Sequence, residues 1–393
     1  MSRGQSSFRY NFFILGCQFN YYDAARVSHE LDILGGRQAK LEMADLIIAL
    51  ACSVRQKAVD RLIGHIRNWR VLNTKAKIVV GACVLPADRR RLAKRVERIA
   101  SSRELKTETA AILKSIGIKY LTKEHTICAP NSVSPYQLYN PKSAFLTITS
   151  GCNNFCTFCA VPYTRTREIS YPASHIIREA KELARSGITH IILLGQNVNS
   201  YGLSGFMPRD LRKNRSPAGK LWTPANPSPF VKLLKRLDKV PKLEKITFLS
   251  PNPQDMSGDL IDWMKKSHKF GRELNLPLQS GSDRVLERMN RRYSQKQYLA
   301  LVERIRRAVP DIYLSTDIIV GFTGETKSDF LESIKVARIC GFQKAFIAMY
   351  SPRAGTAAAK MPDDVPRAEK KRRWEALERL INKHHNNHSN TRE

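Results

Sequence analysis

The chain is poor in acidic residues and in long apolar runs, and each shortage disfavours a class of protein. Its 393 residues contain 35 Asp and Glu against 66 Lys and Arg, a formal net charge of +31. An excess of this size indicates a polyanionic partner, nucleic acid first and an anionic membrane surface second. No apolar run approaches the ~20 residues that a membrane-spanning helix requires. We therefore expect no membrane-spanning segment.

Cysteine is also scarce, with eight residues in the chain. That number is too small for a disulfide scaffold of this length. The N-terminus has a short apolar stretch and no small-residue cleavage site, so we expect a cytoplasmic protein with reduced thiols. Reduced cysteines that cluster are typical of metal ligands or catalytic groups. With 42% apolar residues, the chain has enough to build the cores of two or three domains.

Strand and helix patterns alternate along two long segments, so the fold class is α/β. Residues 8–125 predict a doubly wound parallel-sheet domain. Polar residues 126–142 predict a linker, and residues 143–365 contain six strand–helix units, which predict a partial (β/α)6 barrel. Residues 366–393 predict a basic helix and tail. Strands are expected at 10–15, 45–51, 78–81, 144–150, 191–194, 245–249, 273–277, 313–320 and 344–350. Helices are expected at 23–34, 54–71, 89–101, 175–186, 229–237, 260–266, 294–308, 327–340 and 366–385, and a loop insertion at 203–228.

Three cysteines share one short loop directly after a predicted strand. Cys152, Cys156 and Cys159, here called the loop triad, have the spacing C-x3-C-x2-C. A loop of this size is able to wrap one 4Fe–4S cube and give a thiolate to each of three irons. No fourth cysteine follows nearby, so the fourth iron would be open to a small molecule. A structural zinc site is the alternative, although zinc prefers four ligands.

Three other cysteines each follow a predicted strand of the N-terminal domain. Cys17, Cys52 and Cys83, here called the strand-end triad, stand at the carboxyl ends of strands. In a parallel sheet these ends face one crevice, where ligands bind, so the three thiols are predicted to converge on one metal centre. The alternative is that each is a small buried hydrophobe. Cys128 and Cys340 lack such a placement, and we interpret them as structural.

The two cysteine patterns together resemble the radical-SAM methylthiotransferase family, whose N-terminal domain carries a second 4Fe–4S cluster. Within that family, residues 161–165 (VPYTR) and 195–199 (GQNVN) look like the MiaB type, the tRNA-2-methylthio-N6-dimethylallyladenosine synthases. The family normally continues into a TRAM domain, a small RNA-binding barrel, and we expect this domain to be absent. The resemblance rests on Cys83 and on residues 16–20, 51–55, 151–170, 193–202, 276–283, 315–326 and 350–366.

The resemblance implies a two-cluster enzyme that acts on tRNA. The loop triad would hold the 4Fe–4S cluster that binds S-adenosyl-L-methionine and generates a radical. The strand-end triad would hold the 4Fe–4S cluster that supplies sulfur, and a second S-adenosyl-L-methionine would supply the methyl group. The product would be a methylthio group at C2 of N6-isopentenyladenosine next to the anticodon. The implied partners are the tRNA anticodon loop and an electron donor such as flavodoxin or ferredoxin, and we expect a monomer.

Six further residues are predicted to line the S-adenosyl-L-methionine site, because they follow or lie on predicted barrel strands or adjoin the loop triad. Their alternatives are ordinary strand-end capping, a plain strand-to-helix turn and helix-terminus packing. The six residues are Phe158, Gly195, Gln196, Gln279, Ser315 and Asp317.

Two other functions stay open at this point. One is a methylthiotransferase that acts on threonylcarbamoyl-adenosine of tRNA or on a ribosomal protein. The other is a non-catalytic RNA-binding remnant, against which the six cysteines argue, since a remnant has no physical need for aligned thiols.

Basic residues gather in segments that are expected to contact RNA phosphates. Residues 86–106 carry eight Lys and Arg against three acids, and residues 284–307 carry eight against two. Solvated helix faces are the ordinary explanation of such runs. The net charge makes that explanation insufficient for all of them. The residues expected to contribute are Arg89, Arg90, Arg91, Lys94 and Arg95 in the first segment and Arg288, Arg291 and Arg292 in the second.

Overall fold

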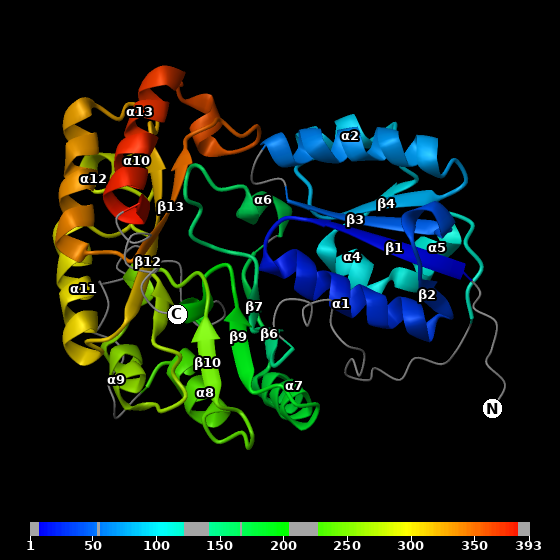
Figure 1. The fold of residues 1–393 in the computed structure, drawn as a ribbon, viewed down its shortest axis with the longest axis horizontal. Helices are drawn as coiled ribbons and strands as arrows, with labels where there is room; N and C mark the ends of the chain where they lie inside the picture. Colours follow the sequence, from blue (N-terminus) through cyan, green and yellow to red (C-terminus); the bar gives the residue numbers. More distant parts are fainter. Residues whose placement is uncertain (1–7, 53–55, 122–140, 166, 204–226, 384–393) are drawn as a thin grey trace. The chain divides into compact units, whose positions relative to one another are not determined.

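The computed structural model describes residues 8–52, 56–121, 141–165, 167–203 and 227–383 (Figure 1). The chain divides into two compact units. Unit 1 consists of Met1–Phe145, Ala160–Thr166 and Arg353–Gly355, and unit 2 consists of Leu146–Cys159, Arg167–Pro352 and Thr356–Glu393. The short segment Ala160–Thr166, which directly follows the loop triad in sequence, therefore belongs to unit 1.

Unit 1 is built on a five-stranded sheet in the order β2-β1-β3-β4-β5. All four neighbouring pairs are parallel. This order is one of the two common doubly wound arrangements, and it confirms the predicted fold class. The strands are β1 (Phe8–Leu15), β2 (Gly36–Gln38), β3 (Leu46–Cys52), β4 (Lys77–Cys83) and β5 (Arg98–Ile99).

Helices cover both faces of this sheet (Figure 1). The central strand β3 is apolar throughout, as expected of a strand buried on both sides. Its alternate side chains enter opposite cores: Leu46, Ile48 and Leu50 pack on one side, and Ile47, Ala49 and Ala51 on the other. The helices are α1 (Gln18–Ile33), α4 (Ser102–Thr107) and α5 (Thr109–Ser115) on one face, and α2 (Gln56–Leu72) and α3 (Pro86–Ala93) on the other.

The helix predicted at residues 89–101 is wrong in its second half. The helix α3 ends at Ala93, and β5 then pairs with β4 through Val79 and Val80. The backbone N–H of Ala100 also donates to the carbonyl of Val80 at 2.9 Å. Pairing with an existing sheet edge outweighs the helix propensity of the basic residues before it.

The predicted partial barrel lies in unit 2, except for Ser143–Phe145 of its first strand, which belong to unit 1. Two three-stranded sheets run in the orders β10-β9-β6 and β11-β12-β13. An isolated parallel bridge joins Ile246 of β10 to Phe270, just before β11. The strands are β6 (Ser143–Thr147), β9 (His190–Leu194), β10 (Lys245–Phe248), β11 (Glu273–Asn275), β12 (Tyr313–Val320) and β13 (Lys344–Met349). The helices are α7 (Ala173–Arg185), α8 (Pro229–Leu237), α9 (Gly258–Lys266), α10 (Asp283–Arg288), α11 (Gln295–Ala308), α12 (Lys327–Cys340) and α13 (Arg367–Leu377).

Some boundaries in this half of the chain differ from the predictions. The strand expected at 144–150 is interrupted at Ile148, and its second part, β7 (Thr149–Ser150), pairs antiparallel with β8 (Ile169–Ser170). The helix expected at 366–385 consists of α13 followed by a π-helical segment, Glu378–Lys383. A one-turn helix not anticipated from the sequence, α6 (Val161–Thr164), follows the loop triad.

Two predicted segments lie largely outside the described residues, namely the linker at 126–142 and the insertion at 203–228. Within the part of the chain that the structure describes, no helix is long and apolar enough to cross a membrane.

Candidate metal centres and cofactor site

The loop triad lies in a loop that distant side chains hold in place. The backbone N–H of Gly151 donates to Oε1 of Gln196 at 2.6 Å. The side-chain amide of Asn290 donates to the carbonyls of Asn154 and Phe155 at 3.1 and 3.0 Å. Because these partners come from separate segments of unit 2, the loop is fixed from more than one side.

The middle of the same loop is tied down at Thr157. Its backbone N–H donates to the carbonyl of Met289 at 3.1 Å, and its hydroxyl donates to the carbonyl of Arg288 at 2.8 Å. Its own carbonyl accepts from the N–H of Ala358 at 2.8 Å. A loop with this many bonds is organised before any ligand arrives, as an efficient metal site requires.

The thiols of the loop triad differ in exposure. Cys152 is buried, whereas Cys156 and Cys159 are half-buried. Burial raises the pKa of the Cys152 thiol to about 12. The guanidinium of Arg291 lies beside Cys156, with Nη1 3.4 Å from Sγ. Arg291, which was expected to contact RNA, thus directs its side chain to this sulfur, and an RNA contact by it stays a prediction.

The strand-end triad gathers at one edge of the unit 1 sheet, as predicted. Cys52 and Cys83 are direct partners at the ends of β3 and β4, and Cys17 follows β1 as the N-cap of α1. A hydrogen bond from Cys52 lowers the pKa of the Cys17 thiol to about 6, and the charge of Arg165 acts in the same direction. A Cβ at Gly16 would lie 2.8 Å from the Cβ of Cys52, so only glycine permits this approach.

Arg165 is the buried cation of this centre. Its Nε donates to Sγ of Cys83 at 2.9 Å, and its Nη2 lies 3.0 Å from a carboxylate oxygen of Asp23. Its side chain is 3% exposed. Burial raises the pKa of Cys83, and the charge of Arg165 opposes that rise.

The two predicted residues that follow β9 have clear structural partners. Gln196 anchors the start of the loop triad through Gly151. Gly195 is packed so closely that a Cβ would lie 2.3 Å from Oγ1 of Thr149 and 2.8 Å from Cα of Val198. Gln196 thus holds the loop and Gly195 permits close packing beside it, while cofactor contact by both stays a prediction.

Ser315 and Asp317 lie within β12, and Gln279 bonds to the same strand. The backbone N–H of Gln279 donates to the carbonyl of Asp317 at 2.8 Å. Gln279 has a φ of 64°, a left-handed conformation that is uncommon for a residue other than glycine. The hydroxyl of Ser315 accepts a bond from the amide of Asn275 at 3.3 Å. Such strained positions gather at functional sites, which supports the prediction for Gln279.

Phe158 packs inside unit 2 rather than standing free. Its ring lies 6.4 Å from that of Phe322, edge to face, in a cluster with Met289 and Tyr350. This contact matches the packing alternative, and cofactor contact by Phe158 stays a prediction.

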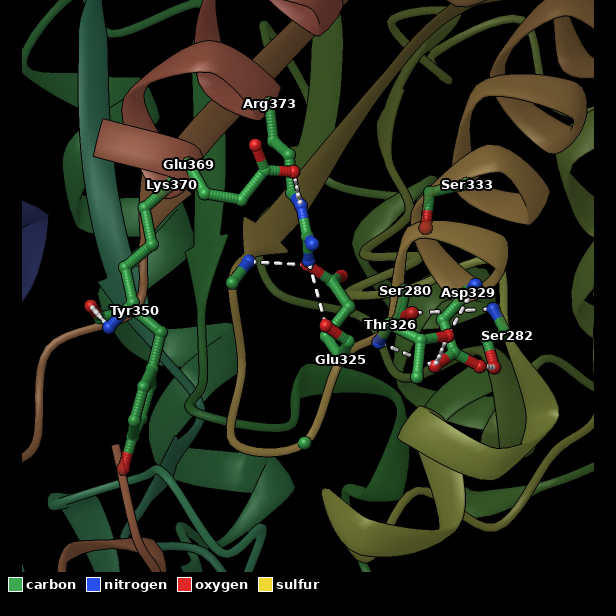
Figure 2. Close-up of polar contacts among 12 residues, drawn as sticks. Ser280, Ser282, Glu325, Thr326, Asp329, Ser333, Tyr350, Glu369, Lys370 and Arg373 are labelled. Carbon is green, nitrogen blue, oxygen red and sulfur yellow. Dashed lines mark hydrogen bonds and ion pairs between the residues drawn. The ribbon is translucent and has the colours of Figure 1, made fainter. Parts of the chain in front are cut away.

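The loop after β12 is locked by helix α13 (Figure 2). Glu325 accepts bonds from the N–H of Gly321 and from Nη1 of Arg373, both at 2.6 Å. On the other side of the loop, Asp329 accepts from the hydroxyls of Ser282 and Thr326 at 2.6 and 2.7 Å. The strand that carries Ser315 and Asp317 therefore ends in a rigid loop.

Each triad has the number of cysteines that a 4Fe–4S cluster with one open iron requires. Each offers three thiols and has an arginine guanidinium beside one sulfur, that of Cys83 in one triad and that of Cys156 in the other. Among the described residues, no three Cys, His, Asp or Glu side chains group tightly enough to hold one metal ion. A cube presents separate irons to its ligands, so its sulfurs lie further apart.

Comparisons with known proteins agree with this architecture. The model of the Radical SAM superfamily matches residues 146–337, and that of the Uncharacterized protein family UPF0004 matches residues 9–102. The solved structure of TsrM from Kitasatospora setae, a radical S-adenosylmethionine methyltransferase, has a TM-score of 0.59 and 14% identity, over 89% of this chain and 77% of that chain. Fold and cysteine sites thus define a radical-SAM protein.

More similar sequences identify the family. A tRNA-2-methylthio-N(6)-dimethylallyladenosine synthase of Caldicellulosiruptor saccharolyticus is 36% identical over 95% of this chain and 77% of its own length. One from Syntrophomonas wolfei is 38% identical over 94% of this chain and 81% of its own length. The chain belongs to this family of radical-SAM methylthiotransferases. Membership implies 4Fe–4S clusters and S-adenosyl-L-methionine as cofactors.

Two arginines contact the cysteine triads without any signal in the sequence that predicts it. Arg165 stands within the family motif at 151–170, yet no role was predicted for it. Arg291 belongs to the run expected to contact RNA, and so does Arg288, which donates to the carbonyl of Thr323 at 3.1 Å. Nothing in the local sequence reveals that either arginine meets a cysteine.

Proposed function

We propose that the chain is a tRNA methylthiotransferase that inserts a methylthio group at C2 of N6-isopentenyladenosine next to the anticodon. The observation that carries this proposal is the presence of two cysteine triads, each with an arginine beside one sulfur, in a chain 36–38% identical to synthases of that name over most of its length. Residues 8–125 would be the methylthiotransferase domain, residues 143–365 the radical-SAM core, and residues 366–393 a C-terminal basic helix and tail.

In this proposal the loop triad holds one cluster and the strand-end triad holds the other. When bound, the clusters and S-adenosyl-L-methionine supply the radical and sulfur chemistry. The chain keeps the loop triad in one shape through Gln196 and Asn290. The residues that we propose to line the cofactor site are Phe158, Gly195, Gln196, Gln279, Ser315 and Asp317.

The basic surface offers places for tRNA phosphates. Between α7 and α8 lies a cavity of about 340 Å³ lined by four cationic side chains and no acidic one. None of the four has a carboxylate partner within ion-pair distance among the described residues. A second basic cavity beside α3 is lined by Arg89, Arg90 and Arg98, with Glu97 as its one acidic residue. The four cationic side chains that line the cavity between α7 and α8 are Arg178, Lys181, Arg185 and Arg236, and Ser174 and Ile177 complete its lining.

The proposed substrate is tested with the tRNA nucleosides of a strain from which the gene for this chain has been deleted. Mass spectrometry of its tRNA should show loss of the methylthio group from isopentenyladenosine, and the unmodified gene should restore it. Loss of a methylthio group from threonylcarbamoyl-adenosine, or from a ribosomal protein, would contradict the proposal and show that the chain modifies that substrate instead.

The proposal also includes an electron donor, an oligomeric state and a cellular location. A small flavodoxin or ferredoxin would supply electrons, and the chain would act as a monomer in the cytoplasm. Sedimentation of the reconstituted protein and reduction assays with each donor measure these points directly.

A further inference from the structure

One arginine contacts one cysteine in each triad. Arg165 donates to Sγ of Cys83 at 2.9 Å, and Arg291 donates to Sγ of Cys156 at 3.4 Å. The first pair lies within unit 1 and the second within unit 2, so the same arrangement occurs twice on unrelated scaffolds. This repetition points to a shared purpose.

The charges around Arg165 do not cancel. Asp23 lies between two cations, 2.9 Å from Nζ of Lys106 and 3.0 Å from Nη2 of Arg165. Two positive charges thus share one carboxylate, and one positive charge is left over beside Cys83. The side chains of Arg165 and Asp23 are 3% and 1% exposed, so water does little to stabilise this excess. A buried net charge is costly unless an opposite charge accompanies it.

The positive charge of Arg291 is likewise not balanced by a carboxylate. Besides Cys156, its guanidinium contacts the hydroxyl of Tyr293 at 3.1 Å and the amide oxygen of Asn252 at 3.4 Å. Both groups are neutral. No carboxylate among the described residues lies within ion-pair distance of Arg291, so it also directs an unbalanced positive charge at a sulfur.

We propose that Arg165 and Arg291 are positioning residues that balance the negative charge of the cysteine thiolates and raise the reduction potential of the cluster in each triad. A one-electron reduction adds one negative charge to the cluster and moves no proton. A fixed positive charge beside a ligand sulfur stabilises that added charge, and bonds to ligand sulfurs are a recognised means of tuning such potentials. The inference rests on the proposed function, because it presupposes both clusters.

The experiment isolates one cluster at a time in the full-length, anaerobically reconstituted protein. Replacing the loop triad with alanine leaves the strand-end cluster alone. In that background Arg165→Gln, Arg165→Lys and Asp23→Asn are compared by iron content and by a redox titration followed with electron paramagnetic resonance.

An electrostatic role and a purely structural role of Arg165 predict different shifts of the midpoint potential in these variants. Arg165→Gln should lower the midpoint potential enough to change the reduced-to-oxidised ratio at least tenfold, about 59 mV for one electron. Asp23→Asn should raise the potential, because it removes the opposing charge. Arg165→Lys should stay near the unmodified value. A purely structural role would move the Gln and Asn variants in the same direction.

The second arm uses a background in which the strand-end triad is replaced with alanine. Arg291→Gln should lower the potential of the remaining cluster, and Arg292→Gln, at the exposed neighbouring position, should leave it unchanged. Equal shifts in both variants would show a general effect of surface charge and overturn the proposal for Arg291.

The remaining outcomes are also decisive. An unchanged potential in Arg165→Gln, or shifts of the same sign in Arg165→Gln and Asp23→Asn, overturns the inference for Arg165. If Arg165→Gln fails to retain iron, retention by Arg165→Lys supports the inference, and loss from both overturns it. Absence of iron from the unmodified chain would instead refute the proposed function.

Discussion

The Nε atom of Arg165 lies 2.9 Å from the Sγ atom of Cys83, although 82 residues separate them in the chain. Arg165 belongs to Ala160–Thr166, the segment that follows the loop triad and packs as part of unit 1. The environment of the strand-end triad therefore depends on residues far outside the N-terminal domain predicted from the sequence.

The cysteine triads lead to the first prediction. The reconstituted chain should hold about eight iron atoms, the content of two 4Fe–4S clusters. Replacing Cys152, Cys156 and Cys159 with alanine should halve the iron and abolish cleavage of S-adenosyl-L-methionine. Replacing the strand-end triad should also halve the iron, keep that cleavage and abolish the methylthio product. Methylthio product from the second variant, measured by nucleoside mass spectrometry, would contradict the assignment of roles.

Gly195 gives a prediction about stability. In Gly195→Ala the new Cβ would lie 2.3 Å from Oγ1 of Thr149 and 2.8 Å from a backbone atom, so we expect a loss of about 1–3 kcal/mol. The control is Gly64→Ala in helix α2, where a Cβ meets nothing within 4 Å. Removing a helix-interior glycine there should stabilise by about 0.5–1 kcal/mol. Urea denaturation of both variants measures the difference, and two changes of the same sign would contradict this account.

The buried pair of Glu325 and Arg373 gives a second stability prediction. Their side chains are 1% and 5% exposed. Arg373→Met would leave Glu325 buried without its cation, at a cost of about 3–5 kcal/mol. The neighbouring Arg372→Met is the matched control, because it removes only an exposed ion pair with Glu369, which contributes about 0–1 kcal/mol. Equal losses of unfolding free energy in the two variants would show that burial of the pair is not what matters.

The cavity between α7 and α8 predicts how tRNA binding responds to salt. Each phosphate neutralised by a cation contributes about 0.7–0.9 to the slope of log affinity against log salt. The double variant Lys181→Glu with Arg185→Glu should weaken binding and reduce that slope by about 1–2. The same charge change at Lys265 and Lys266 of α9 serves as the control and should have a much smaller effect. Matching slopes for the two double variants would exclude the cavity as a contact.

His190 predicts a dependence of stability on pH. Burial, assisted by the charge of Lys245, lowers its pKa to about 4, while its ring bonds to Thr247 at 2.8 Å. The unfolded chain takes up this proton near pH 6.5, the ordinary value for histidine. The contribution of neutral His190 is therefore complete above pH 6.5 and is lost as the pH falls towards 4. In denaturant titrations the unfolding free energy of His190→Gln should fall less over that interval than that of the unmodified chain.

The sequence by itself determined the features that depend on neighbouring residues. The spacing of Cys152, Cys156 and Cys159 places three thiols in one loop whatever surrounds it, and the strand–turn pattern places Cys17, Cys52 and Cys83 at strand ends. Parallel pairing then brings those ends to one edge, as the register of Cys52 with Cys83 shows. Hydrophobic patterning likewise predicted the doubly wound sheet and the six barrel strands.

Tertiary structure alone decided which distant groups meet these thiols. Local helix propensity predicted a helix through residues 98–99, but these residues pair with the edge of β4 and form a strand. Charge composition assigned Arg291 to RNA, yet packing turned it to Cys156. Gln196 binds Gly151, and Arg165 binds Cys83, across 45 and 82 residues of chain. Such contacts arise from the packing of whole elements, because spacing along the sequence carries no information about which distant side chains become neighbours.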